Sequence, residues 1–209
     1  MTRYFAAIEA GGTKCNCAVV DSSQRIVREA RISTTYPAET LAQIVEFFRA
    51  SEVPLSAIGV SCFGPIELDR SSPRYGFITS TPKPAWHNTD FLTPLRQFDI
   101  PIGFDTDVNG AALGEYMFGA GQGYDSLVYF TIGTGIGGGA IIGGAPLHGL
   151  THPEMGHMLL PHDRERDPFV GSCPFHQNCF EGLASGPSIE KRWGCDPATL
   201  PKDHAAWQL

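Results

Sequence analysis

Three potential metal ligands lie close together in the last fifth of the sequence. Cys173, His176 and Cys179 are each separated from the next by two residues, in a polar stretch rich in proline. Thiolate sulfur and imidazole nitrogen are preferred ligands of Zn²⁺, and a closed structural site takes four of them. Candidates for the fourth ligand lie upstream, at His152, His157 and His162. The pattern predicts a structural zinc site, and the alternative is a coincidental cluster in a loop.

Two glycine-rich segments, each between β-prone runs, are candidates for binding phosphate. The first reads Glu-Ala-Gly-Gly-Thr-Lys at 9–14 and the second Thr-Ile-Gly-Thr-Gly at 131–135. Residues without a Cβ let backbone N–H groups approach phosphate oxygens, and threonine hydroxyls add donors. Either segment alone could be a simple turn. The pair together favours two strand-turn-strand hairpins that bind a phosphate chain.

The second glycine segment also fits the letters of a dinucleotide-binding fingerprint, with Gly133, Gly135 and Gly138 at the glycine positions. That fingerprint requires a helix immediately after the turn, and residues 139–143 are strand-like instead. A Walker A motif is absent because no Gly-Lys-Ser/Thr occurs. Neither a Rossmann site nor a P-loop is therefore predicted.

Two aspartates occupy the junction between a predicted strand at 102–104 and a predicted helix. Asp105 and Asp107 could simply cap that helix. The functional interpretation makes Asp107 a general base that accepts a hydroxyl proton, a role that phosphoryl transfer to an alcohol assigns to one carboxylate. Asn109 could then help to hold the substrate.

Composition favours a globular protein that acts on small molecules. The chain has 209 residues, 42% of them hydrophobic, which is enough to bury a core. A formal net charge of -7 without a long Lys/Arg run argues against nucleic acid or anionic membranes as partners. No apolar stretch is long enough to span a membrane, and Glu9 interrupts the N-terminal apolar run, so we expect a cytoplasmic protein. Cys15 and Cys17 are expected to be buried core thiols.

Hydrophobic periodicity and turn residues predict an alternation of strands and helices. Expected strands cover Tyr4–Ala10, 15–20, 57–62, 101–104, 127–131 and 139–142. Expected helices cover 38–49, 91–98, 111–118 and 188–193, with another opening at 201–209. Residues 63–88 should form a long loop or a ragged hairpin. The last segment has no C-cap signal, so we expect the chain to be C-terminally truncated.

These motifs, taken in order, resemble the ROK sugar kinases, and in particular their fructokinase branch. The similarity rests on residues 9–14, on Thr-Asp-Val-Asn at 106–109, on Thr-Ile-Gly-Thr-Gly at 131–135, on Pro-Glu-Met-Gly-His at 153–157 and on residues 179–186. Thr81, Pro82 and Lys83, with Trp86, resemble a segment of the fructokinase branch. Two departures are Glu9, where most of the family has Asp, and His176, where most members have a third cysteine.

The resemblance implies an α/β, actin-like ATPase fold of the ribonuclease H-like type with two lobes, here 1–118 and 119–209, the second incomplete. By similarity, Asp107 is the base. The sugar ligands would be Asn109, Glu154, His157 and Glu181. The ATP phosphate ligands would be Gly11, Gly12, Thr13, Lys14, Gly133, Thr134 and Gly135. The zinc ligands would be His157, Cys173, His176 and Cys179.

The implied function is ATP-dependent phosphorylation of a hexose, with D-fructose converted to fructose 6-phosphate, in the presence of Mg²⁺ and with zinc in a structural role. The family also implies a homodimer. Glucose, mannose and N-acetylhexosamines fit the same chemistry. One alternative is a catalytically incomplete fragment, because family members continue past Leu209 into a segment that builds the adenosine pocket. The other is a sugar-sensing regulator of the same family, whose DNA-binding region would precede Tyr4.

Overall fold

The computed structural model describes residues 2–207, which divide into two compact units. Within this range, the first comprises residues 2–114 and 148–152, and the second comprises 115–147 and 153–207. The division falls inside one helix, α2 (Asp107–Phe118). The lobe boundary at 118/119 that the family resemblance implies stays a prediction.

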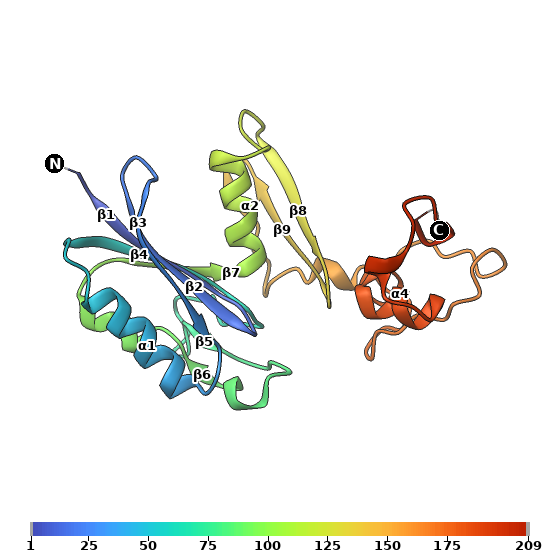
Figure 1. Ribbon diagram of the computed structural model, residues 1–209, viewed down its shortest axis with the longest axis horizontal. Coiled ribbons are helices and arrows are strands. Elements are labelled where there is room, and N and C mark those ends of the chain that lie inside the picture. The colour runs from blue at the N-terminus through green and yellow to red at the C-terminus, as the bar shows by residue number, and fades with distance from the viewer. Residues whose placement is uncertain (1, 208–209) are drawn as a thin grey trace. The chain divides into compact units, whose positions relative to one another are not determined.

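The first unit is built on a five-stranded mixed sheet (Figure 1). Its strands, in spatial order, are β3 (Ile26–Ser33), β2 (Lys14–Asp21), β1 (Tyr4–Ala10), β4 (Leu55–Cys62) and β7 (Ile102–Thr106). The first three are antiparallel, whereas β1, β4 and β7 run parallel. Ala10, Cys62 and Thr106 are successive partners at the carboxyl ends of the three parallel strands. The segments that leave this edge are therefore brought side by side.

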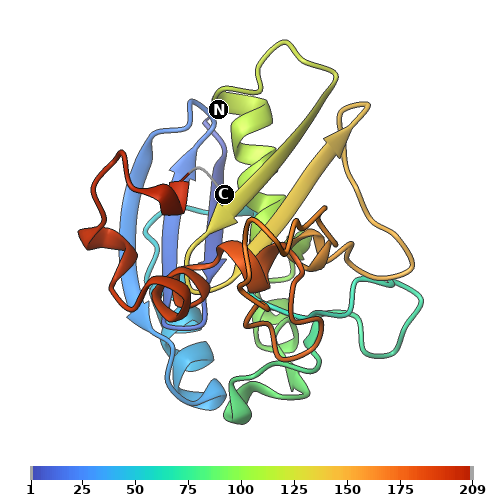
Figure 2. The same cartoon turned by 90° about the vertical axis from the view of Figure 1, so that its right-hand side faces the viewer.

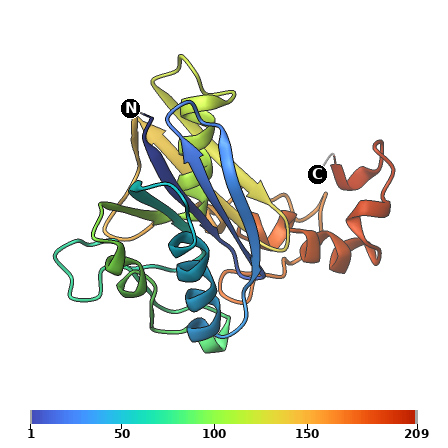
Figure 3. The same cartoon turned by 60° about the vertical axis from the view of Figure 1, so that its left-hand side comes forward.

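Helix α1 (Pro37–Arg49) covers one face of this sheet, as Figures 1 and 3 show. Proline at its first turn is preorganised for a helix start. Leu41, Ile44 and Phe48 recur at helical spacing and are buried in the same core cluster as the inner residues of β1 and β2. The predicted amphipathic helix is thus confirmed.

Residues 63–90 form a ragged hairpin, one of the two predicted alternatives. The short strands β5 (Phe77–Ile78) and β6 (Thr89–Asp90) pair antiparallel. Trp86 anchors the segment, because its side chain is fully buried and packs edge-on against Phe63, with ring centroids 5.5 Å apart. Its indole Nε1 donates a hydrogen bond to the carbonyl of Thr35 over 2.7 Å. The buried indole of Trp86 thus helps to order a segment that lacks hydrophobic periodicity.

The second unit contains a three-stranded antiparallel sheet and two short helices (Figure 2). Its elements are β8 (Ser126–Ile132), β9 (Ile136–Ile142), β10 (Ala145–Pro146), α3 (Phe180–Ala184) and α4 (Gly186–Trp193). Short 3-10 turns across the chain lie at Pro84–Trp86, Thr93–Phe98, Met155–His157, Pro197–Thr199 and Ala205–Trp207. The β8–β9 connection is strand-turn-strand, as predicted, so no helix follows the glycine turn.

Two secondary-structure predictions were wrong in part, and one strand was not predicted. Strand β3 was missed because almost every residue in it is exposed, which leaves no hydrophobic alternation to detect. Residues 91–98 form a six-residue 3-10 turn at Thr93–Phe98, whose start is fixed when Asp90 accepts the N–H of Thr93. The helix expected at 201–209 is a compact 3-10 turn as far as residue 207, and residues 208 and 209 lie outside the described range.

Candidate active site and metal centre

The first glycine turn and Asp107 lie at the same edge of the first sheet, at the carboxyl ends of two parallel strands that are separated by β4. Gly11 follows β1, and Asp107 follows β7, two strands away in the sheet. Because neighbouring strands lie about 4.8 Å apart, the ends of β1 and β7 are separated by roughly 10 Å. Ligands in open α/β sheets bind outside the carboxyl ends of parallel strands. The edge therefore combines a candidate phosphate site with a candidate base.

Asp107 is the first residue of α2, but another side chain caps that helix. Thr106 Oγ1 accepts the N–H of Asn109 over 3.2 Å, which is the capping interaction. Asp107 Oδ1 instead accepts the N–H of the adjacent Val108 over 2.9 Å. Thr106 therefore caps the helix, and capping does not account for the position of Asp107.

The protein around Asp107 raises the pKa of its carboxyl group. The residue is exposed to solvent, yet partial desolvation of the carboxyl group raises this pKa above the usual aspartate value. Glu9 raises this pKa further by charge repulsion, whereas the N–H of Val108 and the nearby His152 lower it. A raised pKa brings a carboxylate closer to the range in which it is an effective general base.

Asn109 is held beside Asp107 by a second aspartate. Its side-chain Nδ2 donates to Asp105 Oδ1 over 2.9 Å, and the Asn109 residue is buried. The other oxygen of Asp105 lies 2.8 Å from Nε2 of His148, which comes from the loop at 148–152. Asp105 therefore orients Asn109, and His148 orients Asp105. The sequence did not predict these roles for Asp105 and His148, because the two residues are 43 positions apart.

The first glycine turn is closed by its own backbone and supported by Thr34. Gly11 N–H donates to the carbonyl of Lys14 over 2.9 Å. Thr34, at the end of β3, uses its hydroxyl to donate to Gly11 O over 2.8 Å and its N–H to donate to Thr13 O over 3.0 Å. Among residues 2–207, the N–H groups of Gly12 and Thr13 have no hydrogen-bond acceptor in the protein. They are therefore available to an anion.

The second glycine turn is supported by the segment that follows the cysteine loop. Gly133 N–H donates to Gly135 O over 2.9 Å, and Gly186 N–H donates to Gly133 O over 2.8 Å. The carboxylate of Glu181 accepts the N–H of Ile136 over 2.9 Å. A Cβ on Gly135 would lie 2.8 Å from that carboxylate, so glycine is what allows Glu181 to approach. Both ends of the Glu181–Gly186 stretch are thus bonded to the turn.

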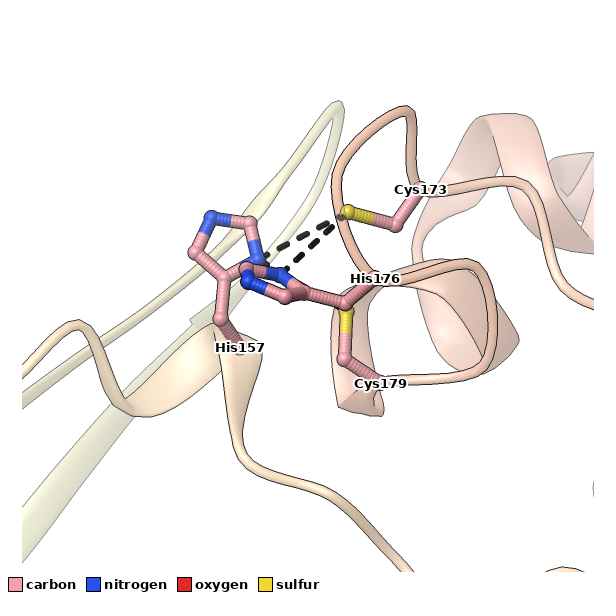
Figure 4. A group of neighbouring side chains, drawn as sticks. All are labelled: His157, Cys173, His176 and Cys179. Carbon is pink, nitrogen blue, oxygen red and sulfur yellow. Dashed lines mark hydrogen bonds between the residues drawn. The ribbon is translucent and has the colours of Figure 1, made fainter.

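The four predicted zinc ligands converge in the second unit (Figure 4). One donor atom from each of His157, Cys173, His176 and Cys179 lies within 4.8 Å of the others. The sulfurs of Cys173 and Cys179 lie 3.8 and 3.6 Å from Nδ1 of His157. Tetrahedral Zn²⁺ with ordinary bond lengths would place sulfur and nitrogen ligands roughly 3.6 Å apart. The donor set and its spacing therefore fit a zinc ion.

Backbone contacts hold the four candidate ligands in place. Gln177 adopts a left-handed conformation, and its N–H donates to Cys173 O over 3.0 Å, which closes the loop between the cysteines. A Cβ on Gly182 would lie 1.8 Å from Gln177 O, so α3 can pack on this loop only with glycine there. A Cβ on Gly156 would lie 1.7 Å from Ile136 O, which places the His157 turn tightly against β9.

The other upstream histidines have different partners. His162 Nε2 lies 3.1 Å from Asp167 Oδ2, and Asp167 also pairs with Arg192 over 2.7 Å. His152 belongs to the first unit and contributes to the electrostatic surroundings of Asp107. Of the three histidines proposed from sequence, His157 is the one whose ring lies with the thiols.

The motif residues lie within a region that matches a known protein family. A model of the ROK family matches residues 5–206. The chain belongs to the ROK family. It is 50% identical over 199 residues to a fructokinase of Zymomonas mobilis, covering 92% of this chain and 65% of that protein. It is 44% identical over 212 residues to a fructokinase of Streptococcus mutans, covering 100% of this chain and 72% of that protein.

The ROK chain also resembles solved structures of its family. The crystal structure of the ROK hexokinase from Thermus thermophilus aligns with a TM-score of 0.73 and 28% identity, covering 91% of this chain and 62% of that one. The architecture is therefore the α/β, actin-like ATPase fold that the motifs implied. The chain spans about two thirds of the length of these relatives.

The structure distributes the ROK motif residues over both units. The first unit holds the first glycine turn with Asp107 and Asn109. The second holds the second glycine turn, the thiol cluster, Glu154 and Glu181. Glu154 has a left-handed backbone with φ of 51°, which is rare for a residue with a side chain and frequent at functional sites. Its carbonyl accepts the N–H of His157 over 2.9 Å, so the two motif residues share one turn.

Proposed function

We propose that this chain carries the catalytic carboxylate, the phosphate-binding turns and the metal loop of an ATP-dependent hexose kinase whose substrate is D-fructose. The observation that carries the proposal is the sheet edge at which Asp107 and the first glycine turn follow the carboxyl ends of β7 and β1, two parallel strands on either side of β4. The choice of fructose is supported by the relatives of 50% and 44% identity, which are both fructokinases.

In the proposed reaction, Asp107 accepts the proton of the O6 hydroxyl of fructose. The resulting oxygen nucleophile forms a bond to the γ-phosphorus of ATP, and the bond from that phosphorus to the β–γ bridging oxygen breaks. ADP leaves with the electron pair, and fructose 6-phosphate is the product. Phosphoryl transfer depends mainly on positioning and charge stabilisation, so one well-placed carboxylate is sufficient as base.

The phosphate chain would be bound by backbone N–H groups and threonine hydroxyls of the two glycine turns. Gly11, Gly12, Thr13 and Lys14 form the first set, and Gly133, Thr134 and Gly135 form the second. Mg²⁺ would neutralise charge on the transferred phosphate. Glu9 fits as a residue near this ion, because its exposed carboxylate stands at the end of β1 beside the turn and accepts a hydrogen bond from Asn16 over 2.6 Å.

Sugar recognition would use the hydroxyl-binding groups of Asn109, Glu154, His157 and Glu181. In the proposed site, zinc is structural and is held by His157, Cys173, His176 and Cys179. The spacing of the four donors and the burial of both thiols support this role. The implied homodimer stays a prediction that analytical ultracentrifugation would test.

The test is ADP release from MgATP with fructose, glucose, mannose and N-acetylglucosamine offered separately. Fructose-dependent release is expected, and Asp107→Asn should reduce turnover by about 10²- to 10⁴-fold while leaving the fructose Kd nearly unchanged. Asp69→Asn is a matched control on an exposed loop. Near-normal turnover in Asp107→Asn would exclude this residue as the base.

The pH profile gives a second test of the same carboxylate. The base form of Asp107 is lost as pH falls through its raised pKa. The acid limb of kcat/KM should therefore lie above about pH 3.9, where an ordinary aspartate titrates. An acid limb at or below that value would contradict the assignment.

A second candidate function is sugar binding without turnover. It is favoured by one observation, that the chain spans 65% of the Zymomonas fructokinase. Thermal stabilisation by fructose without stabilisation by MgATP, together with no ADP release, would support this alternative.

A further inference from the structure

Lys83 reaches the first glycine turn from a distant part of the sequence. Its ammonium group donates to the carbonyl of Gly12 and, over 2.7 Å, to the carbonyl of Thr34. Among the residues that the structure describes, Lys83 forms no salt bridge with a carboxylate. Its charge is therefore matched by carbonyl dipoles, and its positive potential extends to the turn.

The anchored hairpin segment determines where Lys83 lies. Trp86 is fully buried and bonded to Thr35 O, one residue from the Thr34 carbonyl that Lys83 binds. Trp86 N–H donates to Lys83 O over 2.9 Å, and Lys83 N–H donates to Thr81 Oγ1 over 3.3 Å. The backbone at Lys83 is thus fixed on both sides. Its side chain is presented to the turn by a rigid support.

Peptide planarity converts this contact into an orientation of N–H groups. In a trans peptide, the carbonyl of one residue and the N–H of the next point in opposite directions. Lys83 binds Gly12 O, which directs the N–H of Thr13 away from Lys83. Thr34 Oγ1 binds Gly11 O and directs the N–H of Gly12 in the same manner. These are the two N–H groups of the turn that have no acceptor in the described protein.

We propose that Lys83 is a positioning residue of the first phosphate site, which fixes the Gly12–Thr13 peptide so that its N–H faces a bound phosphate and which adds a positive charge behind the turn. This inference rests on the proposed function and extends it. Lys83 need not contact the nucleotide, because it acts through the peptide. Its loss should therefore weaken phosphate binding selectively and leave sugar binding intact.

The experiment compares Lys83→Met, Lys83→Arg and the surface control Lys202→Met with the unchanged chain. MgADP and fructose are titrated separately by calorimetry, and backbone ¹⁵N order parameters of Gly12 and Thr13 are measured in the absence of ligand. We expect Lys83→Met to weaken MgADP binding about tenfold, to change the fructose Kd less than twofold and to lower both order parameters. Lys83→Arg should restore part of the affinity, because it keeps charge and donors in a different geometry. Lys202→Met should match the unchanged chain.

Two results would overturn the inference: MgADP binding within twofold of the unchanged chain in folded Lys83→Met, or order parameters of Gly12 and Thr13 that do not fall. If Lys83→Met does not fold, Lys83→Gln is judged by the same two criteria. If the unchanged chain binds no MgADP, the proposed nucleotide site fails, and the order parameters alone decide the role of Lys83.

Discussion

The turn after β1 and the turn after β8 have similar sequences, but the protein supports them through different groups. In the first turn, the carbonyls of Gly11, Gly12 and Thr13 all accept hydrogen bonds from Thr34 or Lys83. In the second, the only support from outside the turn at a carbonyl among the described residues is the N–H of Gly186, which donates to Gly133 O, and the N–H of Ile136 donates to the carboxylate of Glu181. The carbonyls of the first turn are thus bound by hydrogen-bond donors, whereas an N–H of the second turn is bound by the carboxylate of Glu181.

This difference makes the second turn dependent on the proposed metal loop, residues 173–179. Glu181 and Gly186 belong to a segment that begins directly after Cys179, one of the four proposed zinc ligands. The supports of the first turn, Thr34 and Lys83, belong to the other unit. Changes at the metal loop should therefore alter the second turn and leave the first unchanged.

Removal of the proposed metal should have the largest effect. The binding free energy of a structural zinc is on the order of 10 kcal/mol, and much of it stabilises the folded ligand loop. After treatment with a strong chelator, amide hydrogen exchange at 133–136 and 157–181 should accelerate by about a hundredfold or more, while exchange at 11–14 stays unchanged. Metal analysis by mass spectrometry accompanies the measurement. Equal acceleration of exchange in both turns would contradict the claim that only the second turn depends on the metal loop.

Gly156→Ala should have the next largest effect. The added Cβ would lie 1.7 Å from Ile136 O, so the His157 turn must move away from β9 at a cost of about 3 kcal/mol. Exchange at 133–136 should rise, and metal affinity should fall. Gly114→Ala is the control, because its Cβ would meet nothing within 4 Å and the residue lies inside a helix. If Gly114→Ala lowers the free energy of unfolding as much as Gly156→Ala does, the steric explanation is refuted.

Glu181→Ala should loosen the second turn by about 1–2 kcal/mol, because the N–H of Ile136 loses its acceptor. The measurement is the exchange rate of the Ile136 amide in the absence of sugar, which separates this effect from any role in sugar binding. Glu181→Gln keeps an acceptor oxygen and should retain most of the protection. Unchanged protection in Glu181→Ala would remove the proposed link between metal loop and turn.

Thr34→Val should have the smallest effect, about 1 kcal/mol, and only on the first turn. The substitution keeps the side-chain shape and removes the hydroxyl that donates to Gly11 O. Faster exchange of Gly12 is expected, with no change at 133–136. Thr34→Ser keeps the hydroxyl and serves as control. A response in the second turn would show that the two turns are not independently supported.

Local patterns were sufficient to predict the main strands, α1, both glycine hairpins and three members of the thiol cluster, Cys173, His176 and Cys179, whereas the choice of His157 as the fourth came from the family resemblance. These features depend on periodicity of 2 or 3.6 residues, on glycine at tight turns, or on short ligand spacings. Strand β3 escaped prediction because most of its side chains are exposed and Ile32 is its one buried residue, so pairing with β2 largely defines it.

The supports of the site could not be predicted in the same way. Lys83 and Thr34 donate to backbone carbonyls. Every residue has such a carbonyl, so the residue types at 11–13 do not indicate which side chains bind there. Asp105 and His148 meet through tertiary structure, over a separation of 43 residues. The sequence therefore indicates the groups that could contact substrate, but not the contacts that orient them.

The burial of Trp86 provides an optical reporter for one of the two turns. Its ring lies in an aromatic cluster at 0% exposure, whereas the other two tryptophans lie in the other unit, where Trp193 is partly exposed and Trp207 is 48% exposed. Trp86 should therefore emit at shorter wavelength and resist iodide quenching, while Trp207 is quenched. Unfolding of the segment that carries Lys83 can thus be followed in real time as a red shift of the protected emission, without any added label.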